Sequence, residues 1–463
     1  MGAFPLAIAA YAVLIHLWIA AASRRCFADG FWFGFGLFGA GVSWIYVSLS
    51  QFGGMPAPLA AIATALLCAF LALFPASAGW LQARIPAQAA VRACLLIPAA
   101  LVLLEWLRSW ILTGFPWLAT GYAATGWPLQ GFAPLLGVFG LSFIALSLAG
   151  MAWLAFRGRY VFLLGIVLLL GIGQGLRSVA WTHPEGAPVS AALLQGNVSQ
   201  DLKFQPERYA RTLETYAQLV EGSRAKLTVL PETAVPRFLD LVDAAYLARL
   251  EAAARRNGGD VLVGIPVRTG RDQYYNSVVS LGVSPRQTYH KVHLVPFGEF
   301  VPPALGWTLR LVQIPLGSFS RGGPDQPAIE AGGLRIAVNV CYEDAFGDEM
   351  ARRSPAANLL VNVSNVAWFG DSLAPGQHLQ IARLRAVESG RMHLAATNTG
   401  ITAAIDRDGR VVARLPQFTE GRLEVRAQGF AGITPYMRFH DWPIVLLATA
   451  ILGAAVFAAR RSR

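Results

Sequence analysis

Charged residues are scarce in this chain: they make up 14% of its 463 residues, whereas an ordinary soluble protein carries about 25%. The hydrophobic residue types account for 55% of the sequence. So little charge excludes a disordered chain, a fibrous protein and a single soluble domain. The composition indicates instead a protein with membrane-spanning segments.

Lysine is absent from the first 181 residues, which contain eight arginines and only two acidic residues. Residues 182–459 are nearly balanced, with 27 basic and 25 acidic side chains. The formal net charge of +11 therefore arises mainly in the apolar parts of the chain. A basic stripe on a soluble face would indicate nucleic-acid binding, whereas arginines at the ends of apolar segments indicate membrane topology. We therefore expect no nucleic-acid partner.

Cysteine is also rare, with four in the whole sequence. Cys26, Cys68 and Cys94 lie in or beside apolar segments, and Cys341 is the only one in the polar region. This distribution does not indicate a disulfide framework, even in an oxidising compartment.

Long apolar stretches, in contrast, are frequent, and each is near the ~20 residues that a helix needs to cross the hydrocarbon core of a membrane. The first lacks the basic start and cleavage site of a signal peptide. We predict a six-helix transmembrane bundle at 1–181, an extramembrane domain at 182–440, and a last span with a basic tail at 441–463. The seven stretches are 4–22, 30–49, 58–81, 91–112, 131–156, 160–176 and 443–459.

The arginines at the ends of these stretches predict the orientation of the chain. If the seven segments alternate in direction, nine arginines fall on one side, which should be the cytoplasm. Only Arg108 and Arg177 fall near the other side. The 182–440 domain and the amino terminus are then outside the cytoplasm. The nine are Arg24, Arg25, Arg84, Arg92, Arg157, Arg159, Arg460, Arg461 and Arg463.

Two motifs within the apolar stretches resemble functional sites. Residues 34–39 match G-x-G-x-x-G, but a dinucleotide site needs this string between a strand and a helix. Inside a membrane span, small residues favour close helix packing instead. Glu105 and Arg108 are one helical turn apart and can hide their charges as an ion pair. Because charges inside a membrane are candidates for function by default, a role for this pair stays open.

His290 and His293 suggest a metal site at first sight. No second cluster of Cys, His or acidic residues lies at ligand spacing. The surrounding Q-T-Y-H-K-V-H-L is typical of a strand, where a step of three residues puts side chains on opposite faces. We therefore predict no metal.

From residue 189 onward the pattern changes to short β-rich runs that alternate with polar helical runs. About 240 residues of this kind predict one α/β domain with a sizeable core. The helices are expected at 205–222, 244–257 and 378–389. The strands are expected at V-S-A-A-L-L-Q, L-T-V-L-P, D-V-L-V-G-I-P, S-V-V-S-L, L-R-I-A-V-N-V and A-N-L-L-V-N-V.

Three potentially reactive residues stand where such strands end: Glu232 after L-T-V-L-P, Lys291 after Q-T-Y-H, and Cys341 after L-R-I-A-V-N-V. Strand ends in layered α/β folds are where sites gather. A helix is expected after Cys341, and a helix amino terminus favours a thiolate. A thiolate can attack an acyl carbon, a carboxylate can remove protons, and an ammonium can stabilise an oxyanion. Taken singly, each also has an ordinary structural explanation: a buried small Cys, or a solvated Glu or Lys.

At these three residues the chain resembles the carbon–nitrogen hydrolase, or nitrilase, superfamily, and within it the apolipoprotein N-acyltransferase family. The resemblance implies an αββα sandwich for the extramembrane domain. It also extends over nearly the whole chain from Phe33. The matching strings are F-G-F-G-L-F-G-A-G-V-S-W-I-Y-V-S, F-G-G-M-P, T-G-F-P-W-L, Q-G-N, H-L-V-P-F-G-E-F-V-P and G-I-T-A.

The resemblance implies a role for each matching residue. Glu232 would be the general base, Lys291 would stabilise the tetrahedral intermediate, and Cys341 would carry the acyl group as a thioester. Glu299 and Glu343 would shape the site and position Lys291, and Tyr342 would offer its backbone N–H to the oxyanion.

The chain also departs from the family pattern. The family often has Trp where Phe204 stands and Asp where Val366 stands, and its members usually have seven spans before the domain. Six precede it here.

The implied reaction takes a fatty acyl chain from a phospholipid and passes it to the α-amine of a diacylglyceryl-cysteine at the amino terminus of a lipoprotein, in the bacterial inner membrane and without a cofactor. Two apolar segments, 300–319 with Trp307 and 366–373 with Trp368 and Phe369, suit lids that face lipid, although they can also be ordinary core segments. Two alternatives stay open: a membrane-anchored amidase that uses water, and a non-catalytic receptor with a nitrilase-like cap.

Overall fold

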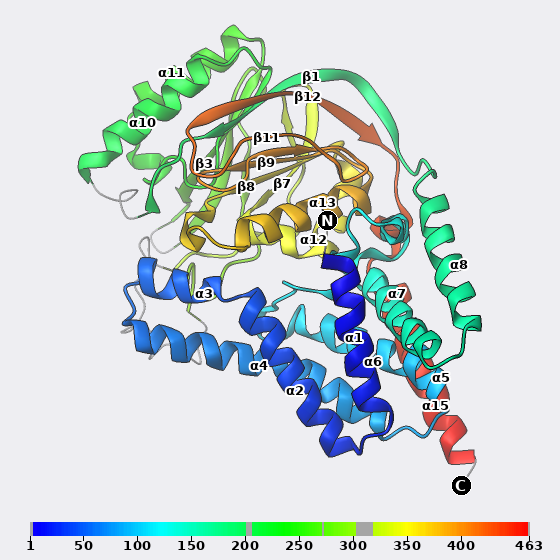
Figure 1. Cartoon of the computed structure of the whole chain (residues 1–463). Helices are drawn as coiled ribbons and strands as arrows, with labels where there is room; N and C mark the ends of the chain where they lie inside the picture. Colours follow the sequence, from blue (N-terminus) through cyan, green and yellow to red (C-terminus); the bar gives the residue numbers. More distant parts are fainter. Residues whose placement is uncertain (1–2, 201–205, 271–272, 302–317, 462–463) are drawn as a thin grey trace. The chain divides into compact units, whose positions relative to one another are not determined.

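The computed structural model describes residues 3–200, 206–270, 273–301 and 318–461. The chain divides into two compact units. A helical unit comprises Met1–Ser43, Ala61–Trp181 and Thr434–Arg463, and a sandwich unit comprises Trp44–Ala60 and Thr182–Ile433. Each unit has its own internal packing (Figure 1).

The helical unit consists of apolar helices, as its composition predicts. Among the described residues, four helical stretches are long and apolar enough to cross a membrane, or five if the broken pair Ser23–Gly41 and Trp44–Phe52 forms one span. The four are Ala57–Ala83, Ala89–Arg108, Pro128–Phe156 and Trp442–Arg461. Its main helices are α1 (Ala3–Ile19), α2 (Ser23–Gly41), α4 (Ala57–Ala83), α5 (Ala89–Val91), α6 (Ile97–Arg108), α7 (Ala133–Phe156), α8 (Val161–Leu176), α14 (Pro435–Phe439) and α15 (Trp442–Arg461).

Two of the predicted spans differ from the helices observed, whereas the 160–176 stretch matches the apolar helix Val161–Leu176 to within one residue. The 4–22 stretch forms the shorter apolar helix Phe4–Ile19. The 30–49 stretch is broken, because α2 ends at Gly41 and Val42 leaves the helical conformation with φ −124° and ψ 21°. Hydropathy alone cannot locate such a break, since the apolar residues continue through it.

Close packing explains the first glycine of the G-x-G-x-x-G string. A Cβ at Gly34 would lie 2.6 Å from Pro75 Cγ and 2.9 Å from Ala72 Cα on α4. A Cβ at Gly36 or Gly39 would meet nothing within 4 Å. The prediction of close helix packing is therefore confirmed at Gly34 alone.

The two charges near the end of α6 are held by local partners. Arg108 donates to the carbonyl oxygens of Phe115 (2.5 Å) and Trp117 (2.7 Å). Glu105 accepts hydrogen bonds from the backbone N–H and the hydroxyl of Thr120, at 3.0 and 2.5 Å. These contacts tie the end of α6 to the turns that follow it, and they support a structural role.

The described part of the sandwich unit contains two mixed six-stranded sheets. Strands β1 to β3 and strands β7 to β9 are parallel within each sheet, and the remaining pairs are antiparallel. In spatial order, the first sheet is β12 (Gly421–Ala431), β1 (His183–Gln195), β2 (Leu227–Val229), β3 (Asp260–Arg268), β4 (Tyr274–Gly282) and β5 (Thr288–His290). The second is β11 (Val411–Arg414), β10 (Ala403–Ile405), β9 (His393–Thr397), β8 (Leu359–Ser364), β7 (Leu334–Val340) and β6 (Ile329–Ala331).

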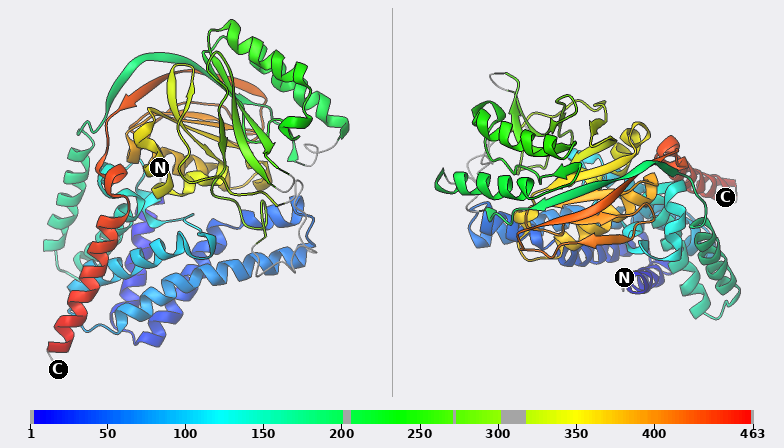
Figure 2. Two further views of the ribbon diagram at one scale, coloured as in Figure 1. Left: turned by 180° about the vertical axis from the view of Figure 1, so that it is seen from behind. Right: turned by 90° about the horizontal axis from the view of Figure 1, so that it is seen from above.

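The two sheets face each other across one apolar core, to which nearly all of their strands contribute. The outer face of the first sheet packs on α10 (Pro206–Glu221) and α11 (Ala244–Arg256) through a second core. Helices α12 (Gly347–Arg353) and α13 (Ala374–Ser389) cover the second sheet. Figure 2 shows this order of helix, sheet, sheet and helix from two further directions. The expected αββα architecture is therefore confirmed.

An early segment of the chain belongs to the sandwich unit. Within Trp44–Ala60, helix α3 (Trp44–Val47) continues into a wider helical turn at Ser48–Phe52. The Trp44 ring lies 4.5 Å from that of Phe369, and Ser48 Oγ donates to the carbonyl oxygen of Trp368 at 2.7 Å. The segment therefore packs against the loop that follows β8.

Candidate active site

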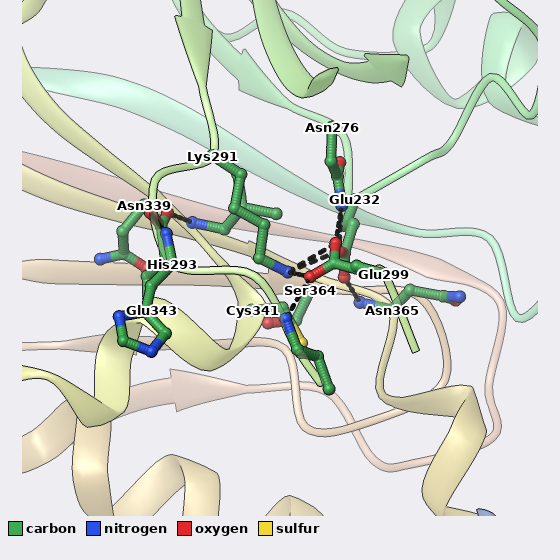
Figure 3. A network of polar contacts seen from close by, with 12 residues as sticks. Glu232, Asn276, Lys291, His293, Glu299, Asn339, Cys341, Glu343, Ser364 and Asn365 are labelled. Carbon is green, nitrogen blue, oxygen red and sulfur yellow. Dashed lines mark hydrogen bonds and ion pairs between the residues drawn. The ribbon is translucent and has the colours of Figure 1, made fainter. Parts of the chain in front are cut away.

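The sandwich brings together the three residues predicted at strand ends. Glu232 lies just beyond β2 and Lys291 directly follows β5, both in the first sheet, while Cys341 directly follows β7 in the second. Figure 3 shows the three side chains converging with Glu299. Residues that are 59 and 50 positions apart in sequence thus meet because the carboxyl ends of strands from two facing sheets lie at one edge.

Cys341 occupies a strained backbone position. Its φ is +54°, a left-handed conformation that costs a residue with a Cβ about 1 kcal/mol or more. It begins the 3₁₀ turn η8 (Cys341–Ala345), which joins β7 to α12. The residue is partly buried and packs against the core between the sheets, so the turn holds the thiol at the strand end, at the edge of that core.

Lys291 is buried between two carboxylates. Its side chain is 1% exposed, and Nζ lies 3.4 Å from Glu232 Oε1 and 2.8 Å from Glu299 Oε2. Burial lowers the pKa of Lys291, but Glu299 and Glu232 outweigh that effect and the net shift is upward. The ammonium therefore stays charged and supplies a fixed positive charge.

Glu232 is held at both oxygens. Oε1 accepts a hydrogen bond from Asn276 Nδ2 at 2.7 Å, and Oε2 accepts one from the backbone N–H of Asn365 at 2.8 Å. The same Asn276 Nδ2 donates to Glu299 Oε1 at 2.7 Å. One amide thus joins the two carboxylates, and Lys291 offsets part of their negative charge.

Glu299 is in turn fixed by its own loop. Its Oε2 accepts from the backbone N–H of Val295 at 2.8 Å, and its backbone N–H donates to the Val295 carbonyl at 2.9 Å. The carboxylate therefore points back toward Lys291.

Glu343 lies beneath the site and links the two strand ends. It is fully buried, and it accepts hydrogen bonds from the backbone N–H groups of Val292 (2.7 Å) and Val340 (2.6 Å). Val292 follows Lys291 and Val340 precedes Cys341, so one carboxylate fixes the backbone beside both. Tyr289 also donates to it, at 2.8 Å.

The surroundings of Cys341 favour a neutral thiol. Burial raises the pKa of the thiol well above its ordinary value, and the nearby Glu232 raises it further, while Lys291 lowers it. The 3₁₀ turn η8 separates Cys341 from the α-helix α12, which begins at Gly347. A neutral thiol needs a base to deprotonate it, and Glu232 is the adjacent carboxylate.

The remaining predicted residues fall into two groups. Tyr342 is buried, and its ring lies 5.0 Å from that of Phe346. Trp368 and Phe369 are half-buried. Phe204 and Trp307 lie outside the described residues, as does most of the 300–319 segment.

The 366–373 segment is not uniformly open. Val366 is buried, and its Cγ2 would lie 2.1 Å from a Cβ placed on Gly400. Leu373 is 62% exposed. Only part of this segment is thus available as a lipid-facing surface.

The predicted strand around His290 and His293 is wrong beyond His290, where β5 ends. The Lys291 N–H still donates to the Asn276 carbonyl, and the chain then leaves the strand, with the N–H groups of Val292 and His293 donating to the Glu343 carboxylate. His290 Nδ1 lies 2.8 Å from Ser277 Oγ, and His293 Nδ1 lies 2.9 Å from Glu349 Oε1. Within the described ranges, no cluster of three or more His, Cys, Asp or Glu residues forms a candidate metal site.

Sequence reasoning missed two asparagines of the site. Asn276 lies within β4, and Asn365 follows β8, with its side-chain amide held by Gln200 and Asn398 at 2.7 and 2.9 Å. A polar residue in the otherwise apolar run around Asn276 was a signal. The partners of a single amide, however, become visible only in the fold.

Two family models and close relatives match this chain. Residues 1–151 match the family model "Apolipoprotein N-acyltransferase N-terminal domain", and residues 190–428 match "Carbon-nitrogen hydrolase". The chain is 48% identical to the apolipoprotein N-acyltransferase of Nitrosomonas europaea, over 99% of this chain and 94% of that protein. It is 46% identical to that of Methylococcus capsulatus, over 97% and 91%. A solved carbon–nitrogen hydrolase superfamily protein of Xanthomonas campestris is 18% identical, covers 57% of this chain and 97% of its own, and has a TM-score of 0.40.

Proposed function

The chain belongs to the apolipoprotein N-acyltransferase family, and on that premise we propose that it transfers a fatty acyl chain from a phospholipid to the α-amine of a lipoprotein's amino-terminal diacylglyceryl-cysteine. The observation that supports this most strongly is the buried Lys291, held between Glu232 and Glu299 beside Cys341. That arrangement pairs a nucleophile with a base and a fixed positive charge, which acyl transfer requires.

In the first half of the reaction, Glu232 removes the proton of the Cys341 thiol, and the sulfur attacks the acyl carbon of the phospholipid. The raised pKa of the thiol makes this base necessary. Lys291, whose raised pKa keeps it charged, stabilises the oxyanion together with the backbone N–H of Tyr342. Glu232 then returns the proton to the departing glycerol oxygen, which releases a lysophospholipid and leaves a thioester.

In the second half, the acceptor amine attacks the thioester carbon. Glu232 takes a proton from the amine and gives it to the Cys341 sulfur as the amide forms, so the enzyme returns to its starting state. Because Glu232 and Glu299 already hold Lys291, and the Asn276 amide holds both carboxylates, the site needs little rearrangement between the halves. Water would compete with the amine, and the apolar side chains of Trp368 and Phe369 would help to exclude it.

The placement of this chemistry follows from the substrates, because both are lipids. We propose that the chain is a multi-pass protein of the bacterial inner membrane. The 1–181 and 441–463 segments would provide its spans, and the 182–440 domain would lie on the extracytoplasmic side. The distribution of arginines supports this orientation.

A direct assay incubates the detergent-solubilised enzyme with phospholipid and a diacylated lipopeptide. The expected products are a triacylated lipopeptide and a lysophospholipid in equal amounts. Cys341→Ala should form neither while remaining folded, whereas Cys94→Ala, which removes a buried thiol of the helical unit, should retain activity. Free fatty acid with no triacylated product would indicate hydrolysis instead of transfer.

A further inference from the structure

A series of hydrogen-bonded, buried polar side chains leads to Ser364 beside the Cys341 thiol, and the proposed reaction gives none of them a role. Its members are completely inaccessible, and they come from the parallel pair β7 and β8 and from the turn η8. Within that pair, Asn339 lies opposite Asn362. In order, the members are Asp344, Asn339, Asn362 and Ser364.

Asp344 fixes the direction of every hydrogen bond in this series. Its Oδ1 lies 3.0 Å from both Asn339 Nδ2 and His393 Nε2. Burial raises the pKa of Asp344, but His393 and His378 outweigh that effect, so the net shift is downward and the group is an acceptor. A carboxylate can only accept. Asn339 must therefore turn its amide nitrogen toward Asp344 and its amide oxygen toward Asn362.

Asn362 passes the same direction onward. Its Nδ2 donates to Asn339 Oδ1 and, at 3.1 Å, to the carbonyl oxygen of Cys341. Its Oδ1 is left to accept from Ser364 Oγ, at 2.6 Å. The single hydroxyl proton of Ser364 is thus directed toward Asn362 while the thiol is neutral.

Ser364 also adjoins the nucleophile. Val340 and Val363 are paired in the parallel ladder, so Cys341 and Ser364 follow as neighbours at the ends of their strands, and Figure 3 shows the two side chains close together. When the Ser364 hydroxyl points to the Cys341 side chain instead, it lowers the pKa of the thiol. Rotation about the Cβ–Oγ bond is all that is needed to exchange one acceptor for the other.

We propose that Ser364 is a further catalytic residue, whose hydroxyl turns from Asn362 to the Cys341 sulfur as the thiol loses its proton. Asn362, Asn339 and Asp344 are positioning residues that hold the hydroxyl ready. No additional proton moves: the S–H proton passes to Glu232, and the Ser364 O–H bond remains intact. The sulfur electron pair then forms the bond to the acyl carbon. This inference rests on the proposed function for its substrate.

The test compares Ser364→Ala with the matched control Ser354→Ala. Ser354 is equally buried and donates to the carbonyl oxygen of Met350 at 2.6 Å, so its loss removes a similar structural hydrogen bond that is not part of the series leading to the thiol. Two rates are measured for each protein. They are alkylation of Cys341 by iodoacetamide across a pH series, and formation of the thioester from phospholipid.

Ser364→Ala should raise the apparent pKa of the thiol and slow thioester formation about 10- to 100-fold, because a hydrogen bond to a charged group is lost. The KM for phospholipid should be unchanged. Ser354→Ala should match the wild type in both rates. Ser364→Gly, which also lacks the hydroxyl, carries the same expectation if the alanine variant does not fold.

Wild-type rates in Ser364→Ala, or an equal slowing in Ser354→Ala, would overturn the inference. A failure of the proposed function would give a different result from a failure of this inference. If phospholipid leaves the wild-type Cys341 unacylated, the acyl donor is wrong, while the alkylation series still decides whether Ser364 acts on the thiol.

Discussion

Replacing Lys291 with methionine tests whether a buried ammonium holds the two carboxylates of the site in their ionised form. Methionine keeps the apolar stem and removes the charge. In the wild type, Nζ lies 3.4 Å from Glu232 and 2.8 Å from Glu299, and the Lys291 side chain is 1% exposed. Without it, the two carboxylates share Asn276 as their common donor and face each other in a buried site.

The expected cost is large because one partner of a buried ion pair is removed. Such a change destabilises a protein by about 3–5 kcal/mol. Two carboxylates that share a site raise the pKa of one of them, so the variant can relieve part of this cost by binding a proton. We therefore expect the full loss at pH 8 and a smaller loss at pH 5.

In the wild type, Lys291 does not make the stability depend on pH in this range. The pKa of Lys291 is raised in the folded state, so its contribution to stability is complete below its ordinary pKa of about 10.4 and is lost only as the pH rises through the folded-state value. Between pH 5 and pH 8 that contribution is constant. In the variant, the carboxyl with the raised pKa contributes stability that is complete below its ordinary pKa and is lost as the pH rises through its folded-state pKa. The variant therefore gains stability as the pH falls toward the carboxyl's ordinary pKa.

Unfolding of the detergent-solubilised protein at both pH values measures the effect. Lys226→Met is the matched control, because Lys226 is exposed and its loss should change stability by less than about 0.5 kcal/mol. A Lys291→Met variant as stable as the control, or one whose deficit is the same at pH 5 and pH 8, would refute the reasoning.

Three further substitutions test other contacts of the structure. Glu232→Gln should block thioester formation, measured by mass spectrometry, while lowering the melting temperature less than Lys291→Met does; normal thioester levels would remove it from the role of base. Glu343→Gln should remove a pH dependence of the stability. Burial raises the pKa of Glu343, so its contribution to stability is present below its ordinary pKa and is lost as the pH rises through the folded-state pKa. Unfolding curves measured from pH 4 to 7 should therefore diverge between wild type and variant. Gly34→Val should reduce the yield of folded protein, since overpacking costs about 1–3 kcal/mol, whereas Gly36→Val should be tolerated; equal yields would contradict the contact with α4.

The strand ends were the part of the site that sequence could predict. Apolar runs that stop at Glu232, Lys291 and Cys341 locate reactive groups where strands finish, and the sandwich brings those ends together. The resemblance added Glu299 and Glu343, which the structure places at Lys291 and beneath both strand ends. Apolar runs identify these positions, because buried strands leave short stretches of apolar residues in the sequence.

Other features depend on contacts that no local pattern records. Asn276 joins two carboxylates from separate segments, and the break after Gly41 interrupts a stretch whose apolar residues continue. In the sequence, the helix expected after Cys341 favours a thiolate, whereas burial and a neighbouring carboxylate determine the pKa of the thiol. The pKa of a group depends on the charges and the burial around it in the fold. A sequence therefore identifies the groups but not which of their effects on the pKa is larger.

The central claim is that Cys341 carries the acyl chain during transfer. Mass spectrometry of the wild-type protein after incubation with phospholipid alone, without the acceptor amine, tests it most directly. We predict one acyl adduct, located on the peptide that contains Cys341 and removed when a diacylated lipopeptide is added. An adduct on another residue, or triacylated product formed by Cys341→Ala, would contradict the account.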